Sequence, residues 1–282
     1  MTRYWTFTGL LRHGALRERL IVSLDMCDRR DALKLVDRRV RVVGMFKVGR
    51  ALFMGGGPDF VREILQRGGE VFLDLKFHDT PDKVLRAAVE AARLGVRMFD
   101  IHPHAPRVPG YACIETMAKM RIAVARVCRT EGLRRPHLLA VTMLAGLSAD
   151  DANAPSGAAA DRVANLARMA ADASLDGVFT SPHELTRVRD ACGRRFIIVT
   201  SGAVTSGAPT PALRMRYGCD SNAYAIGAAD AIRAGADYLV VGSPIWRASE
   251  PIRAVLEITE DIERGLRTSS RGALELLAPR PL

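Results

Sequence analysis

Short apolar runs alternate with longer amphipathic segments from about residue 20 to about residue 265. Each apolar run has the length of a strand, and the segments between them carry apolar residues at helical spacing. The predicted strands span residues 20–25, 42–49, 71–77, 97–102, 137–144, 177–181, 196–202 and 238–242. Predicted helices include residues 58–68, 82–95 and 159–174.

This alternation predicts βαβ units, which build a parallel sheet whose strands are buried on both faces. Eight predicted strands favour an α/β fold of the closed (β/α)₈ TIM barrel type in a single domain, with an open doubly wound sheet as the alternative. We expect the barrel to span residues 20–265, between an N-terminal extension (1–19) and a C-terminal tail (266–282). The irregular segment 203–228 is long enough to be functional or disordered.

The net charge of +10 changes this picture little, because 36 arginines and five lysines are spread along the whole chain. We therefore expect a solvated basic surface and no nucleic-acid partner, with a polyanion partner as the alternative. Five cysteines without a CxxC pair indicate reduced thiols. The sequence has no run of 18 apolar residues and no signal-peptide pattern, which predicts a cytoplasmic protein without a membrane partner.

The predicted strand in 71-VFLDLKFHDTP-81 carries unusual charge for a core strand. The two-residue period places Asp74 and Lys76 on one face with Phe72, inside the barrel. A buried charge needs a partner, and Lys47 on the neighbouring strand supplies a third member of the group. A purely structural ion-pair network is the alternative interpretation.

Other polar residues follow predicted strands, at the barrel end where active sites form. Asp25 is a candidate for the site or for the N-cap of the next helix, and His102 for the site or for a rim position. Cys27 lacks an evident base, and the His102–His104 pair with Asp100 lacks a further matching ligand. We predict neither a cysteine nucleophile nor a metal site.

The chain resembles the orotidine 5′-phosphate decarboxylase family over about residues 20–260. The segment DLKFHDTP matches the DxKxxD signature of that family, which related enzymes acting on sugar phosphates share. The flanking matches agree in order and spacing: LD at 24–25, FKVG at 46–49, GP at 57–58, LGVRMFDIH at 94–102, LLAVTML at 138–144, LDGVFTS at 175–181 and AGADYLVVG at 234–242. The longer context FLDLKFHDTP after FKVG is more similar to the pyrimidine branch.

The resemblance implies a decarboxylase that uses no cofactor and no metal. Its catalytic array would be Lys47, Asp74, Lys76 and, from the neighbouring subunit of a homodimer with shared active sites, Asp79. Lys76 would donate the proton that replaces carbon dioxide at C6 of the pyrimidine. The substrate, a pyrimidine nucleotide or nucleoside, would be bound by Asp25, Thr80, His102, Thr142, Ser201, Asn222, Gly242 and Ser243.

The residues expected to hold the substrate phosphate depart from the family pattern. Ser243 in 242-GSPIW-246 replaces the arginine of a Gly-Arg-Pro motif, and Asn222 in 220-DSN-222 replaces a glutamine. Further changes are 200-TSG-202 for a TPG motif, Ala145 for Ser or Thr, and Lys83 for Thr. Candidate replacement cations are Lys83, Arg214, Arg216 and Arg247.

These departures leave three functions open. The first is orotidine 5′-phosphate decarboxylation with a rebuilt phosphate site, as part of UMP synthesis. The second is the same chemistry on a pyrimidine nucleoside or nucleotide that differs at its 5′ end. The third is a barrel that binds without catalysis, against which the complete charged array argues.

Overall fold

The computed structural model describes residues 16–25, 28–39, 42–103, 110–142, 158–204 and 226–269. Eight parallel strands form a closed barrel in the order β1-β10-β7-β6-β5-β4-β3-β2. The predicted TIM barrel is therefore confirmed, and the open sheet is excluded. The strands are β1 (Leu20–Ser23), β2 (Met45–Gly49), β3 (Val71–Phe77), β4 (Met98–Ile101), β5 (His137–Val141), β6 (Gly177–Thr180), β7 (Ile197–Ser201) and β10 (Tyr238–Val241).

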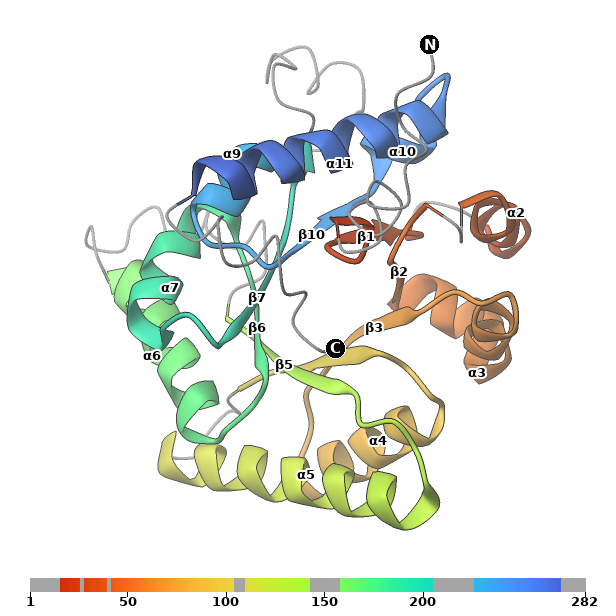
Figure 1. Ribbon diagram of the computed structural model, residues 1–282. Helices are drawn as coiled ribbons and strands as arrows, with labels where there is room; N and C mark the ends of the chain where they lie inside the picture. The colour runs from red at the N-terminus through yellow and green to blue at the C-terminus, as the bar shows by residue number, and fades with distance from the viewer. Residues whose placement is uncertain are drawn as a thin grey trace.

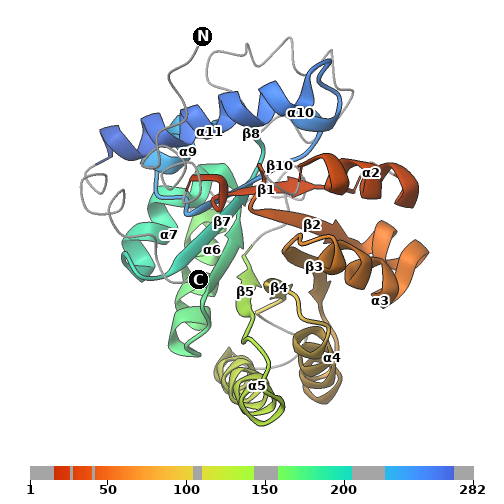
Figure 2. The same ribbon diagram turned by 45° about the vertical axis from the view of Figure 1, so that its right-hand side comes forward.

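Helices surround the barrel, with α3, α4 and α5 along one side and α6 and α7 along another (Figures 1 and 2). Helix α11 crosses the short helix α9 and packs against it. The helices are α2 (Arg29–Arg39), α3 (Arg50–Gln66), α4 (Pro81–Arg93), α5 (Gly110–Glu131), α6 (Ala158–Asp172), α7 (Leu185–Cys192), α9 (Ala228–Arg233), α10 (Ser243–Trp246) and α11 (Pro251–Thr268). A 3₁₀ turn, η2, spans Pro182–Glu184.

The sequence pattern placed most of these elements well and missed one helix start. Strand β3 has the predicted bounds, and the other strands begin or end within a few residues of their predictions. Helix α3, predicted from residue 58, begins at Arg50 and is kinked where Gly57 has a φ of 61° and Pro58 follows. Proline removes a backbone donor and usually marks a helix start, which explains the late prediction.

Side chains alternate along β3 as predicted. Phe72 lies in a small cluster inside the barrel, whereas Leu73, Leu75 and Phe77 pack outward into the larger core shared with the helices. The pairing of β3 with β4 slips between Leu73 and Phe77. Inside this region Lys76 has a φ of 51°, which is uncommon for a residue with a Cβ atom.

Two carboxylates, the half-buried Asp176 and the buried Asp237, lie near the N-terminal ends of the strands. Asp176 accepts a hydrogen bond from the backbone N–H of Leu138 at 2.8 Å and pairs with Arg135. Asp237 accepts one from the backbone N–H of Ile198 at 2.8 Å and another from Arg189 at 2.7 Å. Each carboxylate therefore ties neighbouring strands together at this end of the barrel.

The long segment before β10 is bracketed by two short strands. Strand β8 (Ala203–Val204) pairs in parallel with β9 (Ile226–Gly227). Residues 205–225 lie outside the described residues. The proposed boundaries at residues 19 and 265 remain predictions, although Leu16 is already buried in the core.

Candidate functional site

Four of the predicted residues meet at the C-terminal ends of β1, β2 and β3. Lys47 Nζ lies 2.8 Å from Asp74 Oδ2 and also contacts Asp25, while Lys76 contacts the other oxygen of Asp74. The Lys47 and Asp74 side chains are buried, and Lys76 is nearly so. The array is thus an alternating chain of carboxylate and ammonium groups at the mouth of the barrel.

This alternation keeps the array charged. Burial alone would lower the pKa of Lys47, but the carboxylates of Asp74 and Asp25 outweigh it and raise that pKa. Burial alone would raise the pKa of Asp74, but Lys47, together with Asp100 and Lys76, holds it below its usual range. At neutral pH, Lys47 is therefore an ammonium group and Asp74 a carboxylate.

Asp25 is held in the array and does not cap the following helix. Asp25 Oδ2 accepts hydrogen bonds from Ser23 Oγ, at 2.9 Å, and from Lys47 Nζ. The start of α2 is capped by Asp28 instead, whose side chain accepts the backbone N–H of Asp31. A Cβ atom on Gly49 would lie 2.0 Å from Asp25 Oδ1. Glycine at the end of FKVG therefore makes room for the Asp25 carboxylate.

Sequence reasoning missed Asp100 as a member of this group. The side chain is fully buried, its Oδ1 accepts the backbone N–H of Lys76 at 2.8 Å, and its Oδ2 lies 3.6 Å from Lys76 Nζ. Burial, followed by the neighbouring Asp74, raises the pKa of Asp100 well above its usual range. The strand period could have predicted this position, because Asp100 in 97-RMFDIH-102 lies two residues after Met98, which faces the barrel interior.

On the opposite side of the mouth, the described residues are polar but uncharged. Thr142, a predicted substrate ligand, shares a hydrogen bond of 2.7 Å with Thr180, whose backbone carbonyl accepts from Thr200 at 2.9 Å. Below them the Phe179 ring lies 5.2 Å from Lys76 Nζ, close enough for a cation–π contact. A ligand between the two sides would meet charge on one face and hydroxyl groups with an aromatic floor on the other.

The second aspartate of the signature does not join the array of its own chain. Asp79 is exposed, accepts the N–H of Thr80 at 2.7 Å and pairs with Lys83 at 3.1 Å. The Thr80 N–H, followed by Lys83, lowers the pKa of Asp79. Thr80 is exposed as well and precedes α4. Asp79 therefore presents a negative charge outward from the loop after β3.

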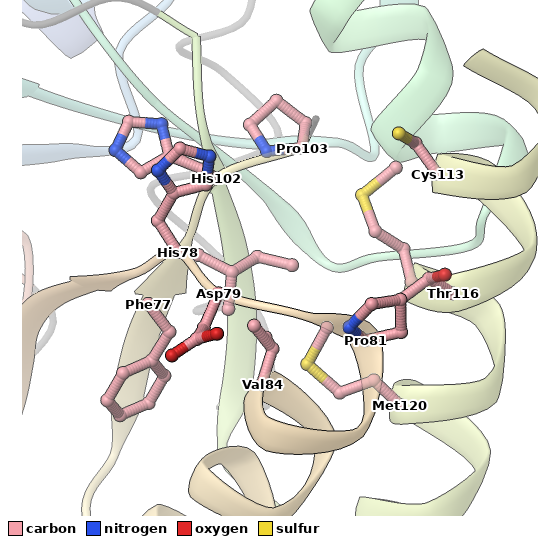
Figure 3. Close-up of a pocket in the computed structure, with 12 residues that line it drawn as sticks. Phe77, His78, Asp79, Pro81, Val84, His102, Pro103, Cys113, Thr116 and Met120 are labelled. Carbon is pink, nitrogen blue, oxygen red and sulfur yellow. The ribbon is translucent and has the colours of Figure 1, made fainter. Parts of the chain in front are cut away.

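A cavity of about 470 Å³ connects this loop with the array, because Lys76, Asp79 and Lys83 all line it. His102 also lines it and packs against His78, with 4.8 Å between ring centroids and 50° between the ring planes. Figure 3 shows the two rings above the Asp79 loop, at the edge of a smaller pocket that α5 closes on the far side. His102 thus lies at the rim of the site and not inside the array.

The predicted phosphate end is described only in part. Gly242 and the half-buried Ser243 lie at the start of α10, and a Cβ on Gly242 would lie 3.5 Å from the Ser23 side chain. Ser201 is half-buried at the end of β7. Arg247 stacks on Trp246, with 4.8 Å from its guanidinium carbon to the ring centroid. Asn222, Ala145, Arg214 and Arg216 lie outside the described residues.

Three further expectations concern cysteines, metals and membranes. Among the described residues, Cys113, Cys128 and Cys192 form no disulfide bond, whereas Cys27, Cys219 and His104 fall outside the described residues. Within the described ranges, no group of three acidic, histidine or cysteine side chains is arranged to hold a metal ion. Among the described helices, none is long and apolar enough to cross a membrane.

Comparison with known proteins shows the family of the chain. Residues 18–258 match the model of the orotidine 5′-phosphate decarboxylase / HUMPS family. The orotidine 5′-phosphate decarboxylase of Pelobacter propionicus is 39% identical over 255 residues, covering 88% of this chain and 97% of that protein. The enzyme of that name from Syntrophotalea carbinolica is 40% identical over 252 residues, covering 89% and 97%.

Solved structures give the same assignment. The crystal structure of orotidine 5′-phosphate decarboxylase from Lactobacillus acidophilus superposes with a TM-score of 0.67 at 27% identity, covering 86% of this chain and 97% of that one. The Pyrococcus horikoshii enzyme, at 21% identity and a TM-score of 0.63 over 86% and 98% of the two chains, supports the fold alone. The chain belongs to the orotidine 5′-phosphate decarboxylase / HUMPS family.

Proposed function

We propose that the protein is a cofactor-independent carboxy-lyase that converts orotidine 5′-phosphate to UMP and carbon dioxide, in pyrimidine nucleotide biosynthesis. The observation that carries this proposal is the buried Lys47–Asp74–Lys76 chain at the barrel mouth. Its relatives of 36–40% identity bear the name of that enzyme. We expect it to work in the cytoplasm.

In the proposed reaction, the bond between C6 and the carboxylate of the substrate breaks and the electron pair stays on C6. Fixed charges lower the barrier when they are already placed where the negative charge develops, and the Lys76 ammonium is such a charge. Lys76 then transfers a proton to C6, and solvent restores the proton on Lys76. The net reaction consumes one proton and releases carbon dioxide.

The carboxylates have separate proposed roles. Asp74 holds both lysines and lies beside the departing carboxylate of the substrate, and Asp25 binds the ribose together with Lys47. These roles are supported by the contacts of Lys47 with both carboxylates. Thr142 and the other hydroxyl groups across the mouth are assigned to the pyrimidine, because they offer neutral donors and acceptors.

We also propose a homodimer in which Asp79 completes the site of the partner subunit. Support comes from the exposure of Asp79, which carries a lowered pKa but has no contact with Lys47, Asp74 or Lys76 among the described residues. Mixing inactive Asp79→Asn and Lys76→Ala subunits tests this proposal. Shared sites predict that activity returns in the mixture, because one site type then receives both native residues. Unchanged inactivity in a mixed dimer would contradict it.

Turnover by the purified protein tests the main proposal. Loss of orotidine 5′-phosphate absorbance is followed, and the measurement is repeated with orotidine. The proposal expects turnover of the phosphorylated substrate that Lys76→Ala abolishes. Turnover of neither compound would refute it, whereas preference for orotidine would assign the same chemistry to a substrate with a different 5′ end.

Ser243 motivates the second experiment. An arginine that forks onto phosphate makes charge-assisted hydrogen bonds worth about 1.5–3 kcal/mol each. If this position still faces the phosphate, Ser243→Arg is expected to lower KM for orotidine 5′-phosphate about tenfold or more and to leave KM for orotidine unchanged. No change in either KM would place phosphate recognition on other residues.

A further inference from the structure

Lys76 has a backbone conformation that needs support. Its φ of 51° lies in the left-handed region, which residues with a Cβ atom seldom occupy. It sits where the β3–β4 pairing slips, between Leu73 and Phe77. The N–H of Lys76 bonds instead to Asp100 Oδ1, on the neighbouring strand, at 2.8 Å. The Asp100 side chain therefore substitutes for a strand partner at the residue proposed to deliver the proton.

The second oxygen of Asp100 faces the array. Oδ2 is buried, has no hydrogen-bond partner among the described residues and lies 3.6 Å from Lys76 Nζ. Lys76 Nζ also contacts Asp74 Oδ1, so the Asp74 and Asp100 carboxyl groups face the same ammonium group. Two adjacent buried carboxyl groups resist double ionisation, and a single proton between them removes the repulsion.

We propose that Asp100 is a positioning residue, which fixes Lys76 through its backbone N–H and fixes Asp74 through a proton held on Asp100 Oδ2. Each oxygen of the Asp100 carboxyl group makes one of these two contacts. Oδ1 sets the backbone conformation, and hence the direction of the Lys76 side chain. Oδ2 donates to Asp74, which leaves the negative charge on Asp74 between the two lysines. This inference rests on the proposed decarboxylase function.

The raised pKa of Asp100 agrees with this geometry, since burial and then Asp74 both favour the protonated form. Lys47 faces Asp74 from β2, and Lys76 faces both carboxyl groups from β3. On the β5 side, the register partner of Asp100 is the apolar Leu139. The described neighbours thus offer the Asp100 proton one anionic acceptor, Asp74.

The substitution Asp100→Asn distinguishes the proposed positioning role from a requirement for a negative charge at position 100. The asparagine amide has an oxygen for the Lys76 N–H and an N–H for Asp74, which reproduces protonated aspartate. Leucine has similar size and neither group. We expect Asp100→Leu to lower kcat by about 100-fold or more, in the range of a lost proton donor, and Asp100→Asn to stay within about fivefold of wild type.

Several readouts distinguish positioning from a general structural effect. KM for orotidine 5′-phosphate and the affinity for UMP are expected to change less than about threefold in both variants, since neither bond of Asp100 is made to the ligand. Met98→Leu is the matched control, because Met98 is fully buried on the same interior face of β4. It is expected to keep the wild-type kcat. Equal loss of kcat in the Asn and Leu variants, or none in the Leu variant, would overturn the proposal.

Infrared spectroscopy tests the proton directly and does not require Asp100→Leu to fold. At neutral pH the wild-type protein is expected to show the carbonyl stretching band of a buried protonated carboxyl group, which Asp100→Asn removes. A spectrum unchanged by that substitution would overturn the proton assignment. The band is independent of turnover, so failure of the decarboxylase proposal would appear as absent wild-type activity with the band still present.

Discussion

The two ends of the barrel both hold carboxylates with little exposure to solvent, but they pair them with different cations. At the N-terminal end, Asp176 and Asp237 each bind an arginine and a backbone N–H of an adjacent strand. At the C-terminal end, Asp74 lies between two lysines. An arginine fork holds a fixed geometry and does not lose its proton, whereas a lysine is a point charge that can transfer one. The same carboxylate chemistry thus stabilises strands at one end and, in the proposed mechanism, holds a proton donor at the other.

Of the substitutions that test this comparison, Lys76→Ala is expected to have the largest effect on kcat. Removal of the proposed acid is expected to lower kcat by about 10²–10⁴-fold. The thermal midpoint should change much less than kcat, since Lys47 still pairs with Asp74 in this variant. Orotidine 5′-phosphate turnover and circular dichroism measure the two properties. Wild-type kcat in this variant would remove the functional half of the comparison.

Asp237→Ala at the other end is expected to do the reverse. It leaves Arg189 and the N–H of Ile198 without a buried carboxylate, which is expected to cost about 3 kcal/mol of unfolding free energy. The kcat of the folded fraction should stay at the wild-type value. Urea unfolding and active-site titration provide the measurements. A lower kcat with unchanged stability would show that the ends are not functionally separate.

Gly49→Ala probes how tightly the active end is packed. The new Cβ would lie 2.0 Å from Asp25 Oδ1, so the carboxylate must move. Misplacement by about 1 Å can cost about 100-fold in rate, which is the expected loss in kcat/KM. Gly55→Ala is the matched control, because a Cβ there meets no atom within 4 Å. Equal effects of the two substitutions would contradict the proposed crowding at Asp25.

Acid is expected to weaken the N-terminal end through Asp176. Burial alone would raise its pKa, but His137, Arg135 and the Leu138 N–H lower it to about 2. Since the unfolded value is about 3.9, the stabilisation is present above about pH 4 and is lost as the pH falls toward 2. The expected loss is about 2 kcal/mol relative to Asp176→Asn, which lacks this titration. Parallel pH profiles for both proteins would refute the assignment.

The smallest effect is expected at Asp100, and it has the opposite sign. A carboxyl group whose pKa is raised by folding lowers stability as the pH rises above its unfolded value of about 3.9. Asp100→Asn removes this cost and is expected to raise Tm at pH 7 by about 2–4 °C, which corresponds to about 1 kcal/mol in a domain of this size. Scanning calorimetry measures it. A lower Tm would indicate that ionised Asp100 stabilises the fold.

The sequence predicted the barrel and the core of the site because both depend on simple periods. Alternation along β3 was enough to place Asp74 and Lys76 inside, and the neighbouring strand supplied Lys47. Asp100 was missed because its role depends on the β3–β4 slip and on the left-handed Lys76, neither of which a two-residue period contains. The requirement for glycine at position 49 was missed for the same reason, because it depends on where the Asp25 carboxylate lies in the folded protein.

The pairing of β8 with β9 has a consequence for how this enzyme family can diversify. The pairing holds the two ends of the connection, at Val204 and Ile226, on neighbouring strands, whose backbones lie about 4.8 Å apart. With its ends held in this way, the connection can gain or lose residues at an entropic cost that rises only with the logarithm of its length. Insertions and deletions between Val204 and Ile226 can therefore accumulate without shifting the register of β2 and β3, the strands that carry Lys47 and Lys76.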